Sequence, residues 1–429
     1  MRTRKIKVDM LARVEGEGSL TVKIRPGSEV DVELGIFEPP RFFEAFLVGR
    51  RYDEAPDITA RICGICPIAY QISSATAMES ALGVRVEGPL RDLRRLIYCG
   101  EWVESHALHV HLLHAPDFLG FQDAIQMASK FGPEVERGLR IKKIGNHLMS
   151  IVGGREVHPI NVKIGGFYSV PDKAGLRKIR PDLERALEDA IAAARWTAGL
   201  DFPDFEPPTE YVAMRHRDEY PLFEGNLAST EGLDIPLEAF FDEFVEIHEK
   251  RSHALHGRRR NGGCYHVGPL ARLNLNRERL LPLSAALADE IVPERPVRNP
   301  FRSILVRGVE TVYALEEALR IVDAYEMPDR PDVPYEVRAG TGVGCSEAPR
   351  GICWHSYSID DKGDILNARI VPPTSQNQPR MEEDLRQLIP ANLELNDDDL
   401  RWRCEQAVRN YDPCISCATH FLRLDIKRS

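Results

Sequence analysis

Two CxxC pairs are the residues of this chain best suited to chemistry: Cys63 with Cys66, and Cys414 with Cys417. Thiolates bind soft metals such as zinc, nickel, copper(I) or the iron of clusters, and a CxxC turn lets both sulfurs face one ion. The pairs lie near opposite ends of the sequence. They form one four-sulfur site only if the fold brings these ends together, and the spacing alone leaves the metal open.

A structural zinc site is the first alternative, because closed sites of four cysteines usually hold zinc. Structural zinc motifs usually keep their two pairs close together in sequence, within a small module that is rich in loops. Here most of the chain separates the pairs, and each pair adjoins a long predicted helix. The spacing therefore favours a site that joins the core of a large fold.

Glu15 and Arg350 carry side chains that could act beside a metal, although the residues alone do not mark them as members of a site. Glu15 lies on a glycine-flanked turn, RVEGEG at 13–18, where a carboxylate can approach a cysteine sulfur closely enough to take a proton bound there. Arg350, in SEAPRG at 346–351, carries a guanidinium that stays charged and could lie over an open coordination position. Taken alone, both residue types are more often found at the surface.

Composition limits the classes of protein to which the chain can belong. Its 429 residues are 43% apolar and 28% charged, as in ordinary soluble globular proteins. The net charge of −10, with no basic block longer than 258–260, argues against nucleic-acid binding. Nine irregularly spaced cysteines predict reduced thiols and metal ligands, which favours the cytoplasm. Because no signal peptide or membrane span is evident, we expect no direct membrane insertion.

The elements that must position these residues follow from hydrophobic periodicity and turn signals. We predict an α-rich α+β fold, with a core bundle of long helices and small peripheral antiparallel sheets. No repeat or linker divides residues 1–429, so we expect a single intertwined domain. The predicted strands are 5–10, 20–24, 30–37, 352–359 and 365–371, and the predicted helices are 42–48, 67–82, 89–114, 122–152, 173–198, 310–325 and, as the last helix, 397–409.

Two further parts of the chain call for interpretation. Residues 200–305 are rich in proline and arginine, which indicates loops and short elements packed on the bundle. Four histidines lie close together in a predicted helix, and we interpret them as buried hydrogen-bonding residues, since the cysteines already account for a metal site. These histidines are His106, His109, His111 and His114.

Five segments occur in an order that resembles one family. They are RVEGEG (13–18), RICGICPIAY (61–70), GGREVHPINVKIGG (153–166), SEAPRG (346–351) and DPCISCATH (412–420). Over nearly the whole chain they are similar to the motifs of the large, catalytic subunit of [NiFe]-hydrogenases. The compact length and the CATH ending resemble the soluble, bidirectional cytoplasmic type. The resemblance implies reversible heterolytic cleavage of H2, with NAD(P) or another soluble molecule accepting the electrons.

The same resemblance implies a role for each cysteine of the two pairs. Cys63 and Cys414 would be terminal ligands of nickel. Cys66 and Cys417 would bridge nickel to an iron that carries carbon monoxide and cyanide, because thiolate sulfur has enough lone pairs to bind two soft ions. Glu15 would accept the proton that the sulfur of Cys414 has taken up.

Arg350 would form a charged canopy over this centre and would pair with Asp412. The sequence departs from the family pattern at two positions. Glu17 directly follows the EG of the first motif, where many members have histidine, so the hydrogen bonding there differs. Ser105 stands where a second canopy aspartate is expected.

Glu44 and His420 match the family's ligands of a magnesium or iron ion near the C-terminus. Oxygen ligands together with several waters suit magnesium. Residues 421–429 resemble the extension that a maturation endopeptidase removes once nickel is in place, which would leave His420 as the new terminus. We therefore expect a cleavable tail.

Five other cysteines show no spacing typical of an iron–sulfur cluster, so the electrons must leave through another chain. The resemblance implies an iron–sulfur small subunit and further subunits that carry flavin or bind NAD(P), since no GxGxxG loop follows a strand here. The alternatives are an H2-sensing regulatory subunit, a respiratory quinone-reductase subunit, which lacks the four ligands, and a structural tetrathiolate zinc protein. The five cysteines are Cys99, Cys264, Cys345, Cys353 and Cys404.

Overall fold

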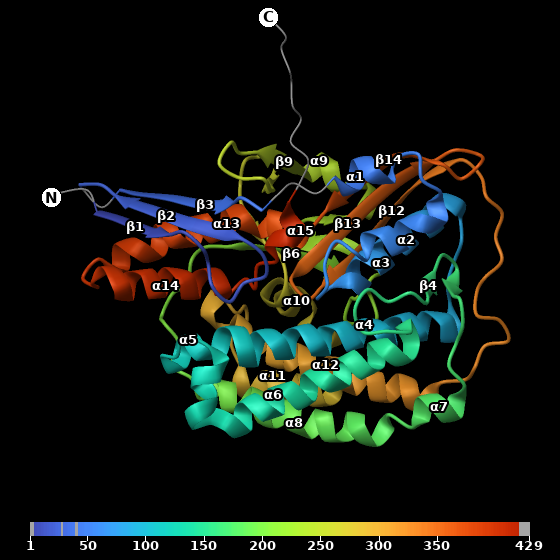
Figure 1. Ribbon diagram of the computed structural model, residues 1–429, viewed down its shortest axis with the longest axis horizontal. Coiled ribbons are helices and arrows are strands. Elements are labelled where there is room, and N and C mark those ends of the chain that lie inside the picture. The colour runs from blue at the N-terminus through green and yellow to red at the C-terminus, as the bar shows by residue number, and fades with distance from the viewer. Residues whose placement is uncertain (1–3, 27–28, 39–41, 420–429) are drawn as a thin grey trace, which may run out of the picture.

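A computed structural model describes residues 4–26, 29–38 and 42–419 of the chain. Its long helices pack side by side in one layer, and the sheets lie against that layer (Figure 1). This arrangement confirms the predicted α-rich α+β fold with a core of long helices. The layer contains α4 (Gly88–Leu108), α6 (Ala124–Gly153), α8 (Arg180–Ala198), α11 (Pro282–Ile291) and α12 (Ser303–Ala324).

Helix α3 (Pro67–Leu82) begins and ends where the sequence predicts. Pro67 occupies the first turn, where the N–H that proline lacks has no partner within the helix. Gly83 follows the last residue with a φ of 70°, a left-handed conformation that glycine adopts without strain. Cys66 is the residue immediately before this helix, so the helix start fixes the position of the first CxxC pair.

Helix α14 (Asp397–Arg409) also has its predicted bounds. The side chain of Asn396 caps it by accepting hydrogen bonds from the N–H groups of Asp398 and Asp399. The prediction that this is the last helix is wrong, because the short helix α15 (Ile415–Ala418) follows it directly after Cys414.

Three other predicted helices differ from the structure in their bounds or continuity. The predicted helix 89–114 consists of α4 and a π-helical segment, His109–His114, after which α5 (Ala115–Leu119) follows. The predicted helix 173–198 is divided into α7 (Lys173–Arg177) and α8, and α12 begins before residue 310. Two short helices, α1 (Phe43–Leu47) and α2 (Ala55–Thr59), precede α3.

The N-terminal strands form the predicted antiparallel sheet. They are β1 (Arg4–Val8), β2 (Gly18–Ile24) and β3 (Val30–Ile36), paired in the order β1-β2-β3. Alternate side chains of β2 are buried, as the alternation of apolar and polar residues indicates. The connection between β1 and β2 carries Glu15.

A second antiparallel sheet carries Arg350. Its strands β13 (Gly351–Ile359) and β14 (Ile365–Val371) form the predicted hairpin, but β12 (Gly340–Ala348) was not predicted. Glycines alternate along β12, and a Cβ at Gly342 would lie 2.2 Å from the carbonyl oxygen of Ala77 in α3. The missing side chains let β12 lie directly on α3, so most of β12 and β13 is buried, whereas β14 keeps exposed side chains.

Residues 200–305 hold more regular structure than the predicted loops and short elements. They contain α9 (Phe240–Glu243), α10 (Pro269–Asn276), α11 and six short strands in two sheets. The strands are β6 (Glu210–Arg215), β7 (Asn226–Ser229), β8 (Asp234–Ile235), β9 (Phe244–His248), β10 (Leu255–Arg259) and β11 (Tyr265–His266). Elsewhere, β4 (Val162–Lys163) pairs with β5 (Gly166–Phe167).

The polar helix α13 (Pro373–Leu388) was also not predicted. It lies against β3, β10, β11 and α15, so it touches elements from both ends of the chain (Figure 1). All four cysteines of the two pairs belong to the largest hydrophobic core cluster. Among the described residues, no helix combines the length and apolar character needed to span a membrane.

Candidate metal centre

The fold brings the two cysteine pairs together. All four side chains are buried, and their sulfur atoms lie within 4.8 Å of one another. The Sγ atoms of Cys63 and Cys414 are 3.5 Å apart, and those of Cys66 and Cys417 are 3.7 Å apart. Four buried sulfurs at this spacing form a donor set for soft metal ions.

One expectation about the cysteines needs correction. Seven of the nine are free, as predicted, but Cys414 and Cys417 are joined as a disulfide. Thiolates, not disulfides, bind metals, so this pair must be reduced before all four sulfurs can act as ligands.

The first pair is held at the start of α3. The backbone N–H groups of Ile65 and Cys66 donate to the Cys63 sulfur at 3.3 and 3.4 Å. The hydrogen bond from the Cys66 thiol lowers the pKa of Cys63, and the same bond, together with burial, raises the pKa of Cys66. Glu101 of α4 accepts from the N–H of Ile68 at 2.6 Å and so fixes the first turn of the helix.

Glu15 lies against the second pair. Its backbone pairs with Cys414 in a parallel bridge, in which the N–H of Ile415 donates to the Glu15 carbonyl at 2.8 Å. Its carboxylate Oε2 is 3.1 Å from the Cys414 sulfur and accepts from the N–H of Ser416 at 3.0 Å. Gly16 permits this approach, because a Cβ there would lie 2.7 Å from the side chain of Ile415. Glu15 is therefore partly buried and lies directly against the Cys414 sulfur.

Two neighbours extend this contact away from the sulfur. The hydroxyl of Ser416 donates to Glu38, whose two carboxylate oxygens lie at 2.9 and 3.0 Å. Ser416 therefore links the two glutamates by hydrogen bonds, with its backbone N–H bound to Glu15 and its hydroxyl bound to Glu38. Glu17 is exposed.

Arg350 and Asp412 are brought together beside the cysteines. Both are buried, and Arg350 donates from Nε to the carbonyl of Asp412 at 2.6 Å and from Nη2 to its Oδ1 at 3.2 Å. Burial opposes the charge, but Asp412 and the sulfurs of Cys66 and Cys63 outweigh it, so the pKa of Arg350 is raised. The Nη1 of Arg350 has no hydrogen-bond partner among the described residues.

Comparison with known proteins identifies the family. The family described as nickel-dependent hydrogenase matches residues 41–137 and 259–420. This chain belongs to the nickel-dependent hydrogenases. It is 34% identical over 423 residues to sulfhydrogenase 1 subunit alpha of Pyrococcus furiosus, with 98% of each chain covered. It is 26% identical to the beta subunit of the NAD-reducing hydrogenase HoxS of Cupriavidus necator, over 98% of this chain and 95% of that subunit.

Solved structures agree with this assignment. The fold superimposes on the crystal structure of an NAD⁺-reducing [NiFe]-hydrogenase in the H2-reduced state with a TM-score of 0.89 and 25% identity, covering 97% of this chain and 99% of that one. The chain is thus the large subunit of a [NiFe]-hydrogenase, an oxidoreductase that acts on H2. This assignment excludes two of the alternatives considered from the sequence, the structural zinc protein and the quinone-reductase subunit.

The second predicted metal site of this hydrogenase subunit lies only partly within the described residues. Glu44, in the first turn of α1, accepts from the N–H of Ile370 at 2.7 Å. His420 and the tail 421–429 lie outside the described residues, so this site and the cleavage of the tail stay predictions. Ser105 is buried on α4, and its hydroxyl has no partner in the described part of the chain.

The four histidines are buried and do not form a metal group. His106 contacts Glu310 at 2.9 Å, and His109 contacts the carbonyl of Arg409 at 2.8 Å. Burial lowers the pKa of all four, to about 4 for His106 and His111. Besides the four cysteines, the described residues contain one cluster of possible ligands, around His216, and its two carboxylates already pair with Arg91.

Two residues that contact the site from neighbouring helices were not predicted from the sequence. Thr374 of α13 accepts from the N–H of Cys414 at 3.0 Å through its hydroxyl oxygen. Arg307 of α12 lies 3.5 Å from Asp412 and is almost completely buried. Neither residue lies in a predicted helix, and a polar residue type taken alone normally indicates a solvent-facing position.

Proposed function

We propose that this subunit cleaves H2 reversibly at the four-cysteine site and passes the electrons to an iron–sulfur partner subunit, from which they reach NAD(P) or another soluble acceptor. The contact between the Glu15 carboxylate and the Cys414 sulfur, at 3.1 Å, carries the proposal. It sets a proton acceptor directly beside a metal ligand, as heterolytic cleavage requires. Of the two relatives named above, one is called a sulfhydrogenase and the other an NAD-reducing hydrogenase, and both names support a soluble electron acceptor.

The donor set suits a nickel–iron centre. Four soft sulfur ligands in one buried group can hold two metals that share thiolates. Cys63, Cys66, Cys414 and Cys417 would together hold the nickel and an iron that carries carbon monoxide and cyanide. When bound, such a centre supplies an acceptor for the electron pair of the H–H bond.

The protein's own residues handle the proton and the charge. Glu15 takes the proton from the Cys414 side. Its carboxylate accepts from the backbone N–H of Ser416, and the hydroxyl of the same serine donates to Glu38, so a second carboxylate lies beside this serine to receive the proton. Arg350 remains charged, because its pKa is raised, and its unpaired Nη1 can donate to ligands of the iron. Asp412 holds this guanidinium in place.

The iron–sulfur subunit is expected to dock beside the first CxxC turn. Gly64 within this turn is exposed, and a Cβ there would lie 4.0 Å from Val157. Three apolar residues of the neighbouring segment are about half exposed or more: Val157, Ile160 and Tyr168. An apolar surface this close to the thiolates offers a short exit for electrons and a partner contact that excludes water. Flavin or NAD(P) subunits would then bind to the partner.

Glu44 and His420 are proposed to hold magnesium or iron, and an endopeptidase is proposed to remove 421–429 after nickel is loaded. Carboxylate oxygen suits magnesium, and the family match extends to residue 420. Intact-mass measurement of active protein tests the cleavage: a chain that ends at His420 supports it, and full activity in a chain that ends at Ser429 contradicts it.

The free cysteines favour a cytoplasmic location for the protein, because disulfides are rare in that compartment.

Metal analysis and infrared spectroscopy of the purified complex test the main proposal. We expect one nickel and at least one iron per large subunit, together with the stretching bands of carbon monoxide and cyanide. Stoichiometric zinc without nickel would refute the proposal. An H2-sensing subunit would show the same metals and bands but little turnover, so the rate of H2 oxidation distinguishes the two.

A further inference from the structure

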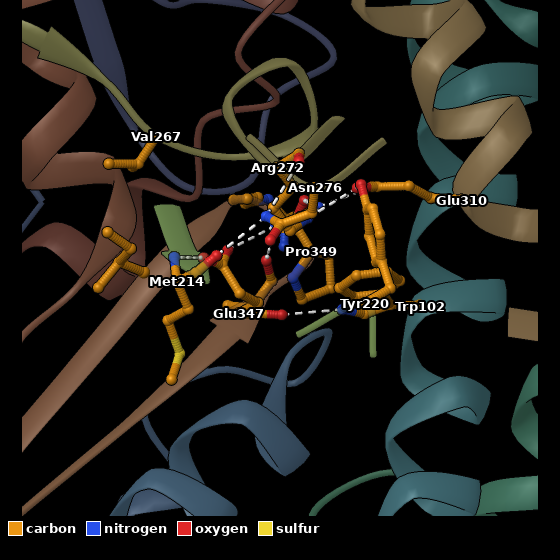
Figure 2. Close-up of polar contacts among 12 residues, drawn as sticks. Trp102, Met214, Tyr220, Val267, Arg272, Asn276, Glu310, Glu347 and Pro349 are labelled. Atoms are coloured by element: carbon orange, nitrogen blue, oxygen red, sulfur yellow. Dashed lines mark hydrogen bonds and ion pairs between the residues drawn. The ribbon is translucent and has the colours of Figure 1, made fainter. Parts of the chain in front are cut away.

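A group of charged side chains is buried directly behind Arg350. Arg272 of α10 lies between Glu310 of α12 and Glu347 of β12, as Figure 2 shows. It binds both oxygens of Glu310 at 2.7 Å and approaches Glu347 to 3.0 Å. Its side chain and those of both glutamates are completely buried.

This group fixes the backbone that leads to Arg350. The indole N–H of Trp102 donates to the carbonyl of Glu347 at 2.9 Å, and Arg272 donates to the carbonyl of Ala348 at 2.8 Å (Figure 2). The next carbonyl, that of Pro349, accepts from Arg272 at 3.2 Å and from Arg307, also at 3.2 Å. Three consecutive carbonyls before Arg350 are thus held by buried side-chain donors.

Arg307 connects this backbone to the partner of Arg350. The Nη1 that donates to Pro349 lies 3.5 Å from Oδ2 of Asp412 and 3.3 Å from Nδ1 of His106. Burial lowers the pKa of Arg307 to about 10, which leaves it charged at neutral pH. Arg307 therefore touches both the segment that carries Arg350 and the carboxylate that Arg350 binds.

Burying charged groups costs desolvation free energy, and packed apolar side chains would stabilise the fold as well or better. Stability alone is thus a weak reason for placing charges here. The contacts of Arg307 converge on Pro349 and Asp412, whose positions determine the direction of the Arg350 guanidinium. This convergence indicates a role in orientation.

We propose that Arg307 is a positioning residue of the hydrogenase reaction: it holds Pro349 and Asp412 from behind and so fixes where the unpaired Nη1 of Arg350 points. The inference rests on the proposed function, because the orientation matters only if Arg350 faces the iron ligands. Arg307 acts through Arg350 and does not touch the metals itself.

The test compares Arg307→Gln and Arg307→Lys with a matched control, Arg94→Gln, in the complete complex. Arg94 is an equally buried arginine on α4 that binds both oxygens of Glu79, at 2.7 and 2.6 Å, and its other hydrogen bond goes to the carbonyl of Lys163, away from the Arg350 segment. The readouts are nickel and iron content, the carbon monoxide and cyanide stretching frequencies, and kcat and KM for H2.

We expect Arg307→Gln to keep both metals, to shift the stretching bands, and to lower kcat about 10- to 100-fold, as loss of an outer partner at a metal site does. Arg307→Lys should recover part of the loss, since an ammonium can still reach Asp412. Arg94→Gln should lower stability without moving the bands.

Unchanged bands and kcat in Arg307→Gln, or an equal shift in Arg94→Gln, would overturn the inference. If Arg307→Gln does not fold, the bands of Arg307→Lys decide: a shift supports the inference, and wild-type bands overturn it. Wild-type protein without nickel or bands would instead refute the proposed function, and this inference would fall with it.

Discussion

The close packing of β12 on α3 predicts that a single methyl group at Gly342 disturbs both the fold and the metal centre. The Cβ of a Gly342→Ala variant would lie 2.2 Å from the carbonyl oxygen of Ala77 and 2.3 Å from the backbone nitrogen of Ala81. Ordinary contacts of a Cβ begin at 3.4 Å. The strand and the helix must therefore separate by about 1 Å, since both clashing atoms are backbone atoms that cannot rotate away.

The cost can be estimated from overpacked cores, in which extra methyl groups cost about 1–3 kcal/mol. Because neither backbone can yield locally, we expect a loss of roughly 3 kcal/mol, at the upper end of that range. The shift also reaches the site, since α3 begins after Cys66 and β12 leads to Arg350. Gly342→Ala should therefore lower nickel content as well as stability.

Urea unfolding of the metal-free subunit measures the first effect, and metal analysis of the matured complex measures the second. Gly132→Ala is the matched control, because nothing lies within 4 Å of a Cβ at that position in α6. Because Gly132 lies between the kink at Phe131 and Pro133, outside a regular helix interior, we expect stability to change there by less than about 1 kcal/mol. Equal urea midpoints for the two variants would refute the packing argument.

Three further predictions concern the site and the response to pH. Glu15→Gln should keep nickel, iron and H2 binding but nearly abolish H/D exchange, because the amide cannot carry the proton; wild-type exchange in a fully metallated variant would remove Glu15 from the mechanism. Arg350→Lys should lose most turnover with its metals intact, since an ammonium lacks the planar fork; unchanged kcat would make Arg350 structural. The pKa of His111 is lowered to about 4 by burial, so the unfolded chain binds its proton more tightly. About 3 kcal/mol of stability, present above pH 6.5, should therefore be lost as pH falls toward 4. Thermal unfolding of His111→Gln should show a shallower pH slope than that of the exposed-site control His248→Gln, and parallel slopes would contradict this.

Local signals in the sequence predicted the elements that obey local rules. Pro67 and Gly83 bound α3, Asn396 caps α14, and apolar alternation marks the N-terminal strands. The two CxxC pairs predicted one site, because only their approach gives a full set of ligands. The sequence could also place Glu15 and Arg350 through their motifs, although neither residue type alone indicates burial.

Tertiary contacts decided the elements that were missed. The glycines of β12 resemble a loop, and their advantage appears only when α3 lies against them. Helix α13 has a polar sequence that predicts exposure, yet nearly all of its side chains are buried. They bond to the backbone of other elements: Gln376 to Ile352, and Gln378 to Leu34. Arg307 was missed for the same reason, since its partners come from distant parts of the chain.

Helix α13 explains how a site assembled from loops and helix ends can be held firmly. Thr374 binds the N–H of Cys414, and Asn377 binds both backbone groups of Val267 and lies 3.5 Å from the carbonyl of Arg350. One helix thus contacts the segments that carry the second cysteine pair and Arg350. A buried polar group that loses its hydrogen-bond partner lowers the free energy of unfolding. A displacement of either segment therefore breaks hydrogen bonds on α13, and this couples the position of the ligands to that of Arg350.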